Sequence, residues 1–271
     1  MFELCISSPY FFPDFLIETD SEEIYESIIS IYDGFSTEVK VNRNGVQVIK
    51  ILKENDTYRI ILEDPTHCII QSLKTSAPLL SVAKHLQRSR KLNPGYFAMH
   101  AAALYREGQT YVFLGKTNTG KTTFVMSLIA NGYQYITDDC VVVDLDTRKI
   151  VPYYQPLKLR KGGIDVLIEN DIHIPELRHV FDSIFDRYIY YPLNSIKEML
   201  DVTNIFQLER IEDGFSHNTL GYIDSFQCLI KSGLVQQSVS QGWLTCASFF
   251  AKKRIVEIKF SNLADLINDF K

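Results

Sequence analysis

The sequence predicts an α/β fold in which a small N-terminal α+β module, residues 1–93, precedes a larger α/β domain, residues 94–271. Three observations support this prediction. Apolar and polar residues alternate on both sides of Asn44-Gly45, a strong hairpin signal, in the first part of the chain. In the second part, a glycine-rich loop stands between an apolar strand pattern and a helical pattern. Pro94-Gly95 supplies the turn at which we place the boundary.

The N-terminal module is expected to combine helices with a small sheet. Residues 21–32 carry apolar side chains at helical spacing and predict a short helix. The hairpin follows over residues 38–51, and residues 56–64 predict a further strand. Residues 76–93 then space their leucines as an amphipathic helix, whose basic end the helix dipole favours.

The glycine-rich loop has the spacing of a phosphate-binding loop: Gly115, four residues, then Gly120, Lys121 and Thr122. In that pattern backbone N–H groups turn inward around phosphates, the lysine reaches the β- and γ-phosphates, and the hydroxyl binds Mg²⁺. An apolar strand pattern precedes the loop and a helical pattern follows it, up to a C-cap expected at Gly132. The pattern therefore predicts a nucleotide site, whose binding residues would be Gly115, Asn118, Thr119, Gly120, Lys121, Thr122 and Thr123.

Strand patterns on both sides of the loop bring further polar residues toward it. Residues 98–105 and 110–115 predict two strands joined by a polar turn, and the first of them contains His100. After the loop helix, a strand at residues 133–137 runs into Asp138-Asp139. Two carboxylates at a strand end suit a Mg²⁺ site and a base that activates a hydroxyl.

The rest of the chain is expected to complete the second domain. Residues 159–170 contain a glycine pair and a basic cluster. We expect helices over residues 173–185, 222–236 and 263–270, and strands over residues 203–210 and 254–260.

Composition excludes several classes of protein. The net charge is −5 with no basic run, so a general nucleic-acid binder is not expected. Five cysteines are scattered without a C-x-x-C pair, which indicates free thiols in a reducing compartment. No apolar run approaches the roughly 20 residues that a membrane span needs. We therefore expect a cytoplasmic protein without membrane or nucleic-acid partners.

Together these residues predict a site for phosphoryl transfer. Lys121 and the loop amides would neutralise the phosphates, and Thr122 with Asp139 would hold Mg²⁺. Asp138, oriented by His100, would take the proton of the acceptor hydroxyl. His100 could instead be the base or an ordinary core residue, and an Asp-Asp pair can also be a simple turn.

The sequences MHAAAL, FLGKTNTGKTT and ITDDCVVV, in this order and spacing, resemble the phosphate-binding-loop kinase core of the HPr serine kinase/phosphorylase family. The small N-terminal module makes the chain most similar to the HPr-kinase-like peptide kinases of lasso-peptide biosynthesis. The resemblance covers residues 96–154 and implies a nucleotide core related to that of phosphoenolpyruvate carboxykinase.

The resemblance implies roles for individual residues. It places His100 on the family's active-site histidine, Asp138 on the catalytic acid or base, and Asp139 on the metal-associated aspartate. Arg160 matches an arginine of a longer signature, in which Lys158 stands where the family has a glutamate. Arg160 is thus a further candidate for contacting a phosphate.

The function expected from the residues and the resemblance is an ATP- and Mg²⁺-dependent kinase that phosphorylates a serine hydroxyl of a peptide or small protein. The alternatives are a nucleotide-binding regulatory or assembly protein that hydrolyses ATP slowly, and a kinase of free serine. A homo-oligomer is compatible with each of them.

Overall fold

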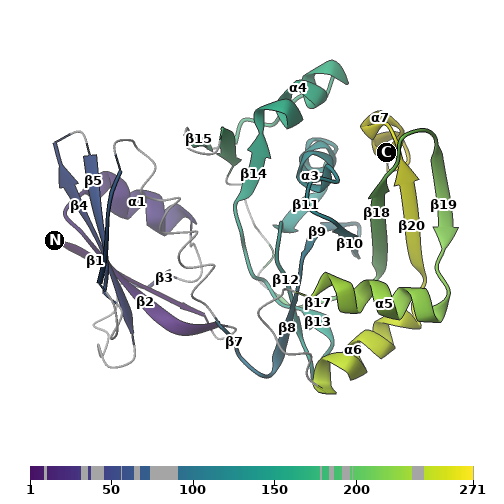
Figure 1. Ribbon diagram of the computed structural model, residues 1–271, viewed down its shortest axis with the longest axis horizontal. Helices are drawn as coiled ribbons and strands as arrows, with labels where there is room; N and C mark the ends of the chain where they lie inside the picture. Colours follow the sequence, from purple (N-terminus) through teal and green to yellow (C-terminus); the bar gives the residue numbers. More distant parts are fainter. Residues whose placement is uncertain are drawn as a thin grey trace. The chain divides into compact units, whose positions relative to one another are not determined.

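The computed structural model describes a mixed α/β protein (Figure 1). The described residues are 1–8, 11–31, 36–37, 46–55, 57–63, 68–73, 91–177, 179–182, 186–190, 196, 198–233 and 241–270. The chain divides into two compact units. The first comprises Met1–Asn93 with Asp182–Phe185, and the second comprises Pro94–Phe181 with Asp186–Lys271.

The first unit is built on a seven-stranded sheet. Its strands follow the order β3-β1-β2-β4-β5-β6, and β7 also pairs with β2. The bounds are β1 Phe2–Ser8, β2 Phe11–Thr19, β3 Ser36–Thr37, β4 Gln47–Glu54, β5 Thr57–Glu63, β6 Cys68–Leu73 and β7 Lys91–Leu92. The helix α1, Glu22–Ile31, contacts β1 and buries Ile24 and Ile28. Burying apolar side chains between helix and sheet is what holds such a module together.

Predictions for the first unit are confirmed in part. The helix over residues 21–32 is α1, and the strand over residues 56–64 is β5. The second arm of the expected hairpin is β4, whereas its first arm and the turn at residues 44–45 lie outside the described residues. Residues 74–90, which hold most of the expected amphipathic helix, also lie outside them. That helix does not extend to residue 93, because β7 is an extended strand paired with β2.

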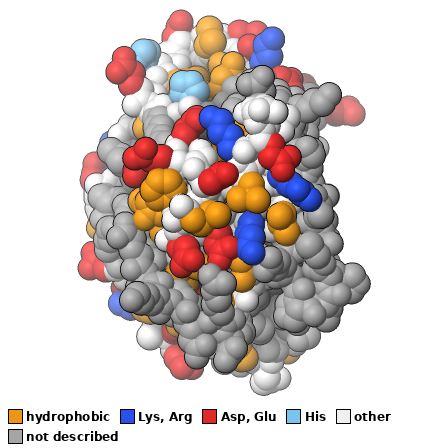
Figure 2. Space-filling view, turned by 90° about the vertical axis from the view of Figure 1, so that its left-hand side faces the viewer, with side chains coloured by type: hydrophobic (Ala, Val, Ile, Leu, Met, Phe, Trp, Pro, Cys, Tyr) orange, Lys and Arg blue, Asp and Glu red, His pale blue; other side chains and the backbone are white. Residues whose placement is uncertain are grey.

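The described surface carries charges of both signs. Figure 2 shows Lys, Arg, Asp and Glu side chains interspersed with hydrophobic ones on one face. None of the described helices has both the length and the apolarity that crossing a bilayer requires.

The second unit is organised around a six-stranded sheet of order β11-β9-β10-β18-β20-β19. Its strands are β9 Ala101–Arg106, β10 Gln109–Gly115, β11 Gln134–Thr137, β18 Asn204–Arg210, β19 Phe215–Thr219 and β20 Ile255–Phe260. β9 and β10 form the expected antiparallel hairpin, and β10 runs parallel to β18, which runs parallel to β20. The loop strand therefore has a hairpin partner on one side and a parallel neighbour on the other.

Helices cover both faces of this sheet (Figure 1). They are α3 Lys121–Ala130 and α7 Leu263–Asn268 on one face, and α5 Tyr222–Ser232 and α6 Gln241–Ala251 on the other. Phe113 of β10 packs its ring against Phe124 of α3 and Phe270 beyond α7. Its neighbours Val112 and Leu114 belong to a core cluster with α5 and α6. Successive side chains of β10 thus point to opposite faces of the sheet, and both faces are buried.

Two smaller sheets complete the second unit. The first has the order β17-β13-β12-β8, and the second β14-β16-β15. Their strands are β8 Tyr96–Met99, β12 Val141–Asp144, β13 Lys149–Ile150, β17 Leu200–Asp201, β14 Leu157–Arg160, β15 His179–Asp182 and β16 Arg187–Tyr190. The helix α4, Lys161–Glu169, follows β14 directly and contacts α3.

Two predictions for the second unit need correction. Residues 98–105 do not form one strand, because the chain bends at His100 and passes from β8 in one sheet to β9 in another. The helix expected over residues 173–185 is wrong, since His179–Asp182 form β15. There the ring of His179 packs against Tyr188 and Tyr190 of β16, a tertiary contact that favours an extended backbone. The expected strands at 203–210 and 254–260 and the last two expected helices are present as β18, β20, α5 and α7.

Candidate functional site

The loop between β10 and α3 has the backbone geometry that its glycines predict. Gly120, at the N-cap of α3, has φ of 95°, and Asn118 also adopts a left-handed conformation with φ of 69°. A Cβ atom on Gly115 would lie 3.2 Å from the carbonyl oxygen of Leu208 in β18. Glycine at this position thus lets the loop strand approach its parallel neighbour closely.

The helix after the loop begins without a side-chain cap. Its N-cap residue Gly120 makes no side-chain cap hydrogen bond within the described part of the chain, and the Gly120 carbonyl accepts from Phe124 N at 2.9 Å. Thr119 closes the loop internally, because its N–H and its hydroxyl both donate to the carbonyl of Lys116. The uncapped N–H groups and the positive end of the helix dipole suit an anionic ligand. Gly132, expected as the C-cap, has φ of 86° and follows the C-cap residue Asn131.

Lys121 and His100 form the centre of the site. Lys121 is only 5% exposed, and its Nζ donates to the carbonyl of Gly115 at 3.1 Å. The same Nζ lies 3.3 Å from Nε2 of His100, whose Nδ1 lies 3.3 Å from the carbonyl of Asp139. A carbonyl only accepts, so Nδ1 carries the proton and Nε2 accepts from Lys121. The His100 imidazole is thus held in one tautomer.

Burial and neighbouring charges shift the pKa values of both groups at this centre. Burial lowers the pKa of Lys121, while the carboxylates of Asp138 and Asp139 act in the opposite direction. Burial, and then the charge of Lys121, lower the pKa of His100. A neutral imidazole at physiological pH is able to accept a hydrogen bond or a proton.

Asp138 and Asp139 lie in different environments, the first buried and the second half-buried. Asp138 is 1% exposed, and its Oδ2 accepts a hydrogen bond of 2.8 Å from the hydroxyl of Thr122. Its Oδ1 is buried and has no hydrogen-bond partner among the described residues. Burial, followed by the charge of Asp139, raises the pKa of Asp138 to about 7. Asp139 is half-buried and has φ of 64°, which turns the chain from β11 toward β12.

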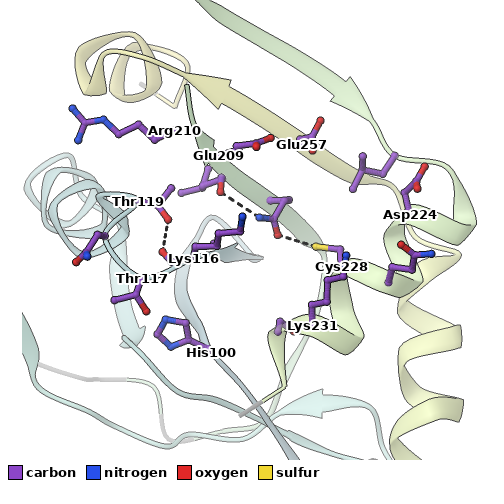
Figure 3. A pocket seen from close by; sticks show the side chains of 17 residues that line it. His100, Lys116, Thr117, Thr119, Glu209, Arg210, Asp224, Cys228, Lys231 and Glu257 are labelled. Carbon is purple, nitrogen blue, oxygen red and sulfur yellow. Dashed lines mark hydrogen bonds between the residues drawn. The ribbon is translucent and has the colours of Figure 1, made fainter. Parts of the chain in front are cut away.

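A pocket of about 1020 Å³ lies beside the loop (Figure 3). It opens at the carboxyl ends of the parallel strands β10 and β18, the edge where ligands bind in open α/β sheets. Its lining comprises loop residues, the carboxyl-terminal half of β18, one residue of β20 and one side of α5: His100, Gly115, Lys116, Thr117, Asn118, Thr119, Gln207, Leu208, Glu209, Arg210, Leu220, Asp224, Gln227, Cys228, Lys231, Ser232 and Glu257. This volume is at the upper end of the usual range for ligand pockets, about 300–1,000 Å³.

The structure brings five of the predicted residues together, with different contacts from those expected. Lys121, His100, Thr122, Asp138 and Asp139 are linked through hydrogen bonds and neighbouring charges. The His100 ring bonds to the backbone of Asp139 rather than orienting the Asp138 carboxylate. Thr122, paired with Asp139 in the sequence-based hypothesis, bonds to Asp138 instead. The cause is the left-handed turn at Asp139, which directs the two carboxylates differently.

Two other candidates face away from this centre. Arg160 is exposed at the N-cap of α4 and is not among the residues that line the pocket. Thr123 faces α4, because a Cβ atom on Gly163 would lie 2.7 Å from its hydroxyl oxygen. Neither position supports a direct contact with a ligand in the pocket.

Sequence reasoning missed the pocket residues that come from α5. Asp224, Gln227, Cys228 and Lys231 are separated by three, one and three positions, which is the spacing of one helix face. That polar stripe was visible in the predicted helix over residues 222–236. Nothing in the local sequence, however, shows that the stripe faces the loop.

No known protein-family model matches the chain, and no curated protein matches it.

Proposed function

We propose that this chain is an ATP- and Mg²⁺-dependent phosphotransferase that phosphorylates the serine hydroxyl of a peptide or small protein in the cytoplasm. The observation that carries the proposal is the buried carboxylate of Asp138, which lies beside the first turn of the loop helix and bonds to Thr122. A protein that only binds nucleotide has no use for a base near its phosphates.

The loop supplies the groups that neutralise a triphosphate. Lys121 Nζ donates to the Gly115 carbonyl and lies against His100 Nε2, so its ammonium is directed into the loop. The uncapped N–H groups of α3 add the positive end of the helix dipole. Lys116, exposed on the loop, adds a positive charge to the wall of the pocket, which Lys121 itself does not line.

The residues present fit Mg²⁺. Burial first, and repulsion by the adjacent Asp139 carboxylate second, raise the pKa of Asp138, whose buried Oδ1 has no hydrogen-bond partner among the described residues. A dication relieves that repulsion, and Mg²⁺ needs only one or two protein ligands because it retains waters. The Thr122 hydroxyl and the Asp139 carboxylate are the groups that would hold it. When bound, the ion neutralises charge that develops on the transferred phosphoryl group.

Asp138 is the group that would accept the proton. One of its oxygens is fixed by Thr122, which leaves the unpartnered Oδ1 for an acceptor hydroxyl. A pKa of about 7 lets the carboxylate ionise near neutral pH and still be basic enough to take a proton. The acceptor hydroxyl would give its proton to Asp138 Oδ1. The hydroxyl oxygen would then form a bond to the γ-phosphorus of ATP, while the bond between that phosphorus and the oxygen bridging to the β-phosphate breaks and ADP leaves.

The test is transfer of labelled γ-phosphoryl from ATP to serine peptides, small proteins and free serine. We expect labelling of the peptide or protein acceptors. Lys121→Ala should abolish it and weaken binding of a non-hydrolysable ATP analogue, because the loop loses its buried ammonium. Lys252→Ala, which removes an exposed lysine outside the pocket, is the matched control. Unchanged affinity and turnover in Lys121→Ala would refute a nucleotide site, and labelling of free serine alone would make the chain a small-molecule kinase.

A further inference from the structure

The pocket has two chemically different ends. Near the loop it is lined by Lys116 and His100, and Lys231 at the last turn of α5 lies on the His100 side (Figure 3). At the far end, Asp224 at the first turn of α5 lies on the same side as Glu257 of β20 (Figure 3). Seven residues of helix separate Lys231 from Asp224, which is about 10 Å along the helix axis. The lysine is thus too distant to neutralise the aspartate.

The far end keeps its negative charge. Nζ of Lys259 lies 3.5 Å from a carboxylate oxygen of Glu257 and 3.0 Å from one of Glu209, so a single positive charge is shared between two negative ones. Asp224 is exposed and forms no ion pair within the described part of the chain. Charges of this kind repel the phosphates of a nucleotide, which the loop end attracts. The far end therefore suits a different ligand from the one that the loop binds.

The middle of the pocket is neutral and fixed. Cys228 Sγ donates to Oε1 of Gln207 at 2.8 Å, and Nε2 of Gln207 donates to the carbonyl of Leu208. Burial, and then the charge of Glu257, raise the pKa of Cys228 to about 12, so this thiol stays protonated. A protonated thiol is a poor nucleophile, so Cys228 lines the pocket without a chemical role.

We propose that Asp224 and Glu257 bind a positively charged group of the phosphate acceptor, the side chain of a lysine or arginine or a free amino group. This inference rests on the proposed function, because the acceptor hydroxyl must reach the loop end. An extended peptide advances about 3.3 Å per residue, so roughly three residues cover the distance between the two ends. The preferred acceptor thus carries its cationic residue about three positions from the serine.

Binding and transfer are measured on three sets of fluorescently labelled nonapeptides with one central serine. The residue three positions from the serine, on either side, is lysine, glutamine or glutamate. Anisotropy in the presence of Mg²⁺ and a non-hydrolysable ATP analogue gives affinity, and labelled ATP gives transfer. We expect the lysine peptide to bind roughly tenfold more tightly than the glutamate peptide, an advantage that shrinks with added salt.

Charge reversal assigns the preference to the far end. Asp224→Lys should abolish or invert the preference for lysine, and Glu257→Gln should reduce it. Asp265→Lys is the matched control, because Asp265 is also an exposed acid in the first turn of a helix but does not line the pocket. Equal affinity for all three peptides, or the same preference in Asp224→Lys, would overturn the inference even if phosphate is transferred. A lysine preference that depends on Asp224 but brings no transfer would support the inference and refute the kinase.

Discussion

Replacing Asp138 by asparagine should separate the chemistry of the site from its stability. Asparagine has the same shape, and its side-chain oxygen can still accept the hydrogen bond from Thr122. It cannot accept a proton. We therefore expect the variant to bind the ATP analogue almost as wild type does, while kcat for an acceptor peptide falls by about 10²–10⁴-fold, the usual contribution of a general base.

The effect on stability has a definite sign. Burial and the charge of Asp139 raise the pKa of Asp138 from 3.8 to about 7, so the folded state holds this proton more tightly than the unfolded chain. Between pH 3.8 and about pH 7 the folded protein therefore binds more protons than the unfolded chain does, and its free energy of unfolding falls as pH rises. A difference of about three pKa units corresponds to roughly 4 kcal/mol. The asparagine variant loses this dependence, so its stability relative to wild type should rise by up to that amount between pH 4 and pH 8.

The assay is urea unfolding at a series of pH values in buffer with a metal chelator. The single tryptophan, Trp243, is buried in the second unit, so its fluorescence reports unfolding of the unit that holds the site. Asp213→Asn, at an exposed position, is the control and should leave the pH dependence unchanged. Added Mg²⁺ should reduce the wild-type loss. Parallel pH curves for wild type and Asp138→Asn would mean that Asp138 is ionised without cost and would refute the reasoning.

Three further changes probe the surroundings of this carboxylate. Asp139→Asn should raise the Mg²⁺ concentration that half-saturates transfer, as a metal titration of initial rates would measure; an unchanged requirement removes Asp139 as a ligand. His100→Ala should lower kcat less than Asp138→Asn does, and the reverse order, with an altered acidic limb of the pH–rate profile, would make His100 the base. Gly163→Ala should destabilise the protein by about 1–3 kcal/mol in urea, because its Cβ would lie 2.7 Å from the Thr123 hydroxyl and 2.9 Å from Leu159. An unchanged midpoint would show that the Thr123 and Leu159 side chains make room for the methyl group without loss of stability.

The sequence predicted most of what depends on local patterns. The loop from Gly115 to Thr122 and the strand and helix that flank it follow from spacing and hydrophobic period alone. The adjacent carboxylates at the end of β11 were also visible as a strand running into two polar residues.

Features that depend on tertiary contacts escaped prediction. β15 reads as helical because its apolar residues fit both periods, and aromatic packing against β16 decides between them. The strand β2, residues 11–19, and the helix α6, residues 241–251, were not predicted from the sequence. Which face of α5 meets the pocket is set by its packing against α6 and the sheet, with Leu229 buried in their shared core.

The sheet topology explains why residues far apart in the sequence converge at one edge. β9 runs antiparallel between β10 and β11, with Ala101 opposite Leu114 and Ala103 opposite Thr137. The carboxyl ends of β10 and β11 and the amino end of β9 therefore lie at the same edge of the sheet. His100 precedes β9 and so lies at the same edge as the loop and the aspartate pair. A parallel strand in this place would carry its first residue to the opposite edge, about 20 Å away for a strand of six residues. The hairpin that precedes the loop is thus what makes a histidine available to the site.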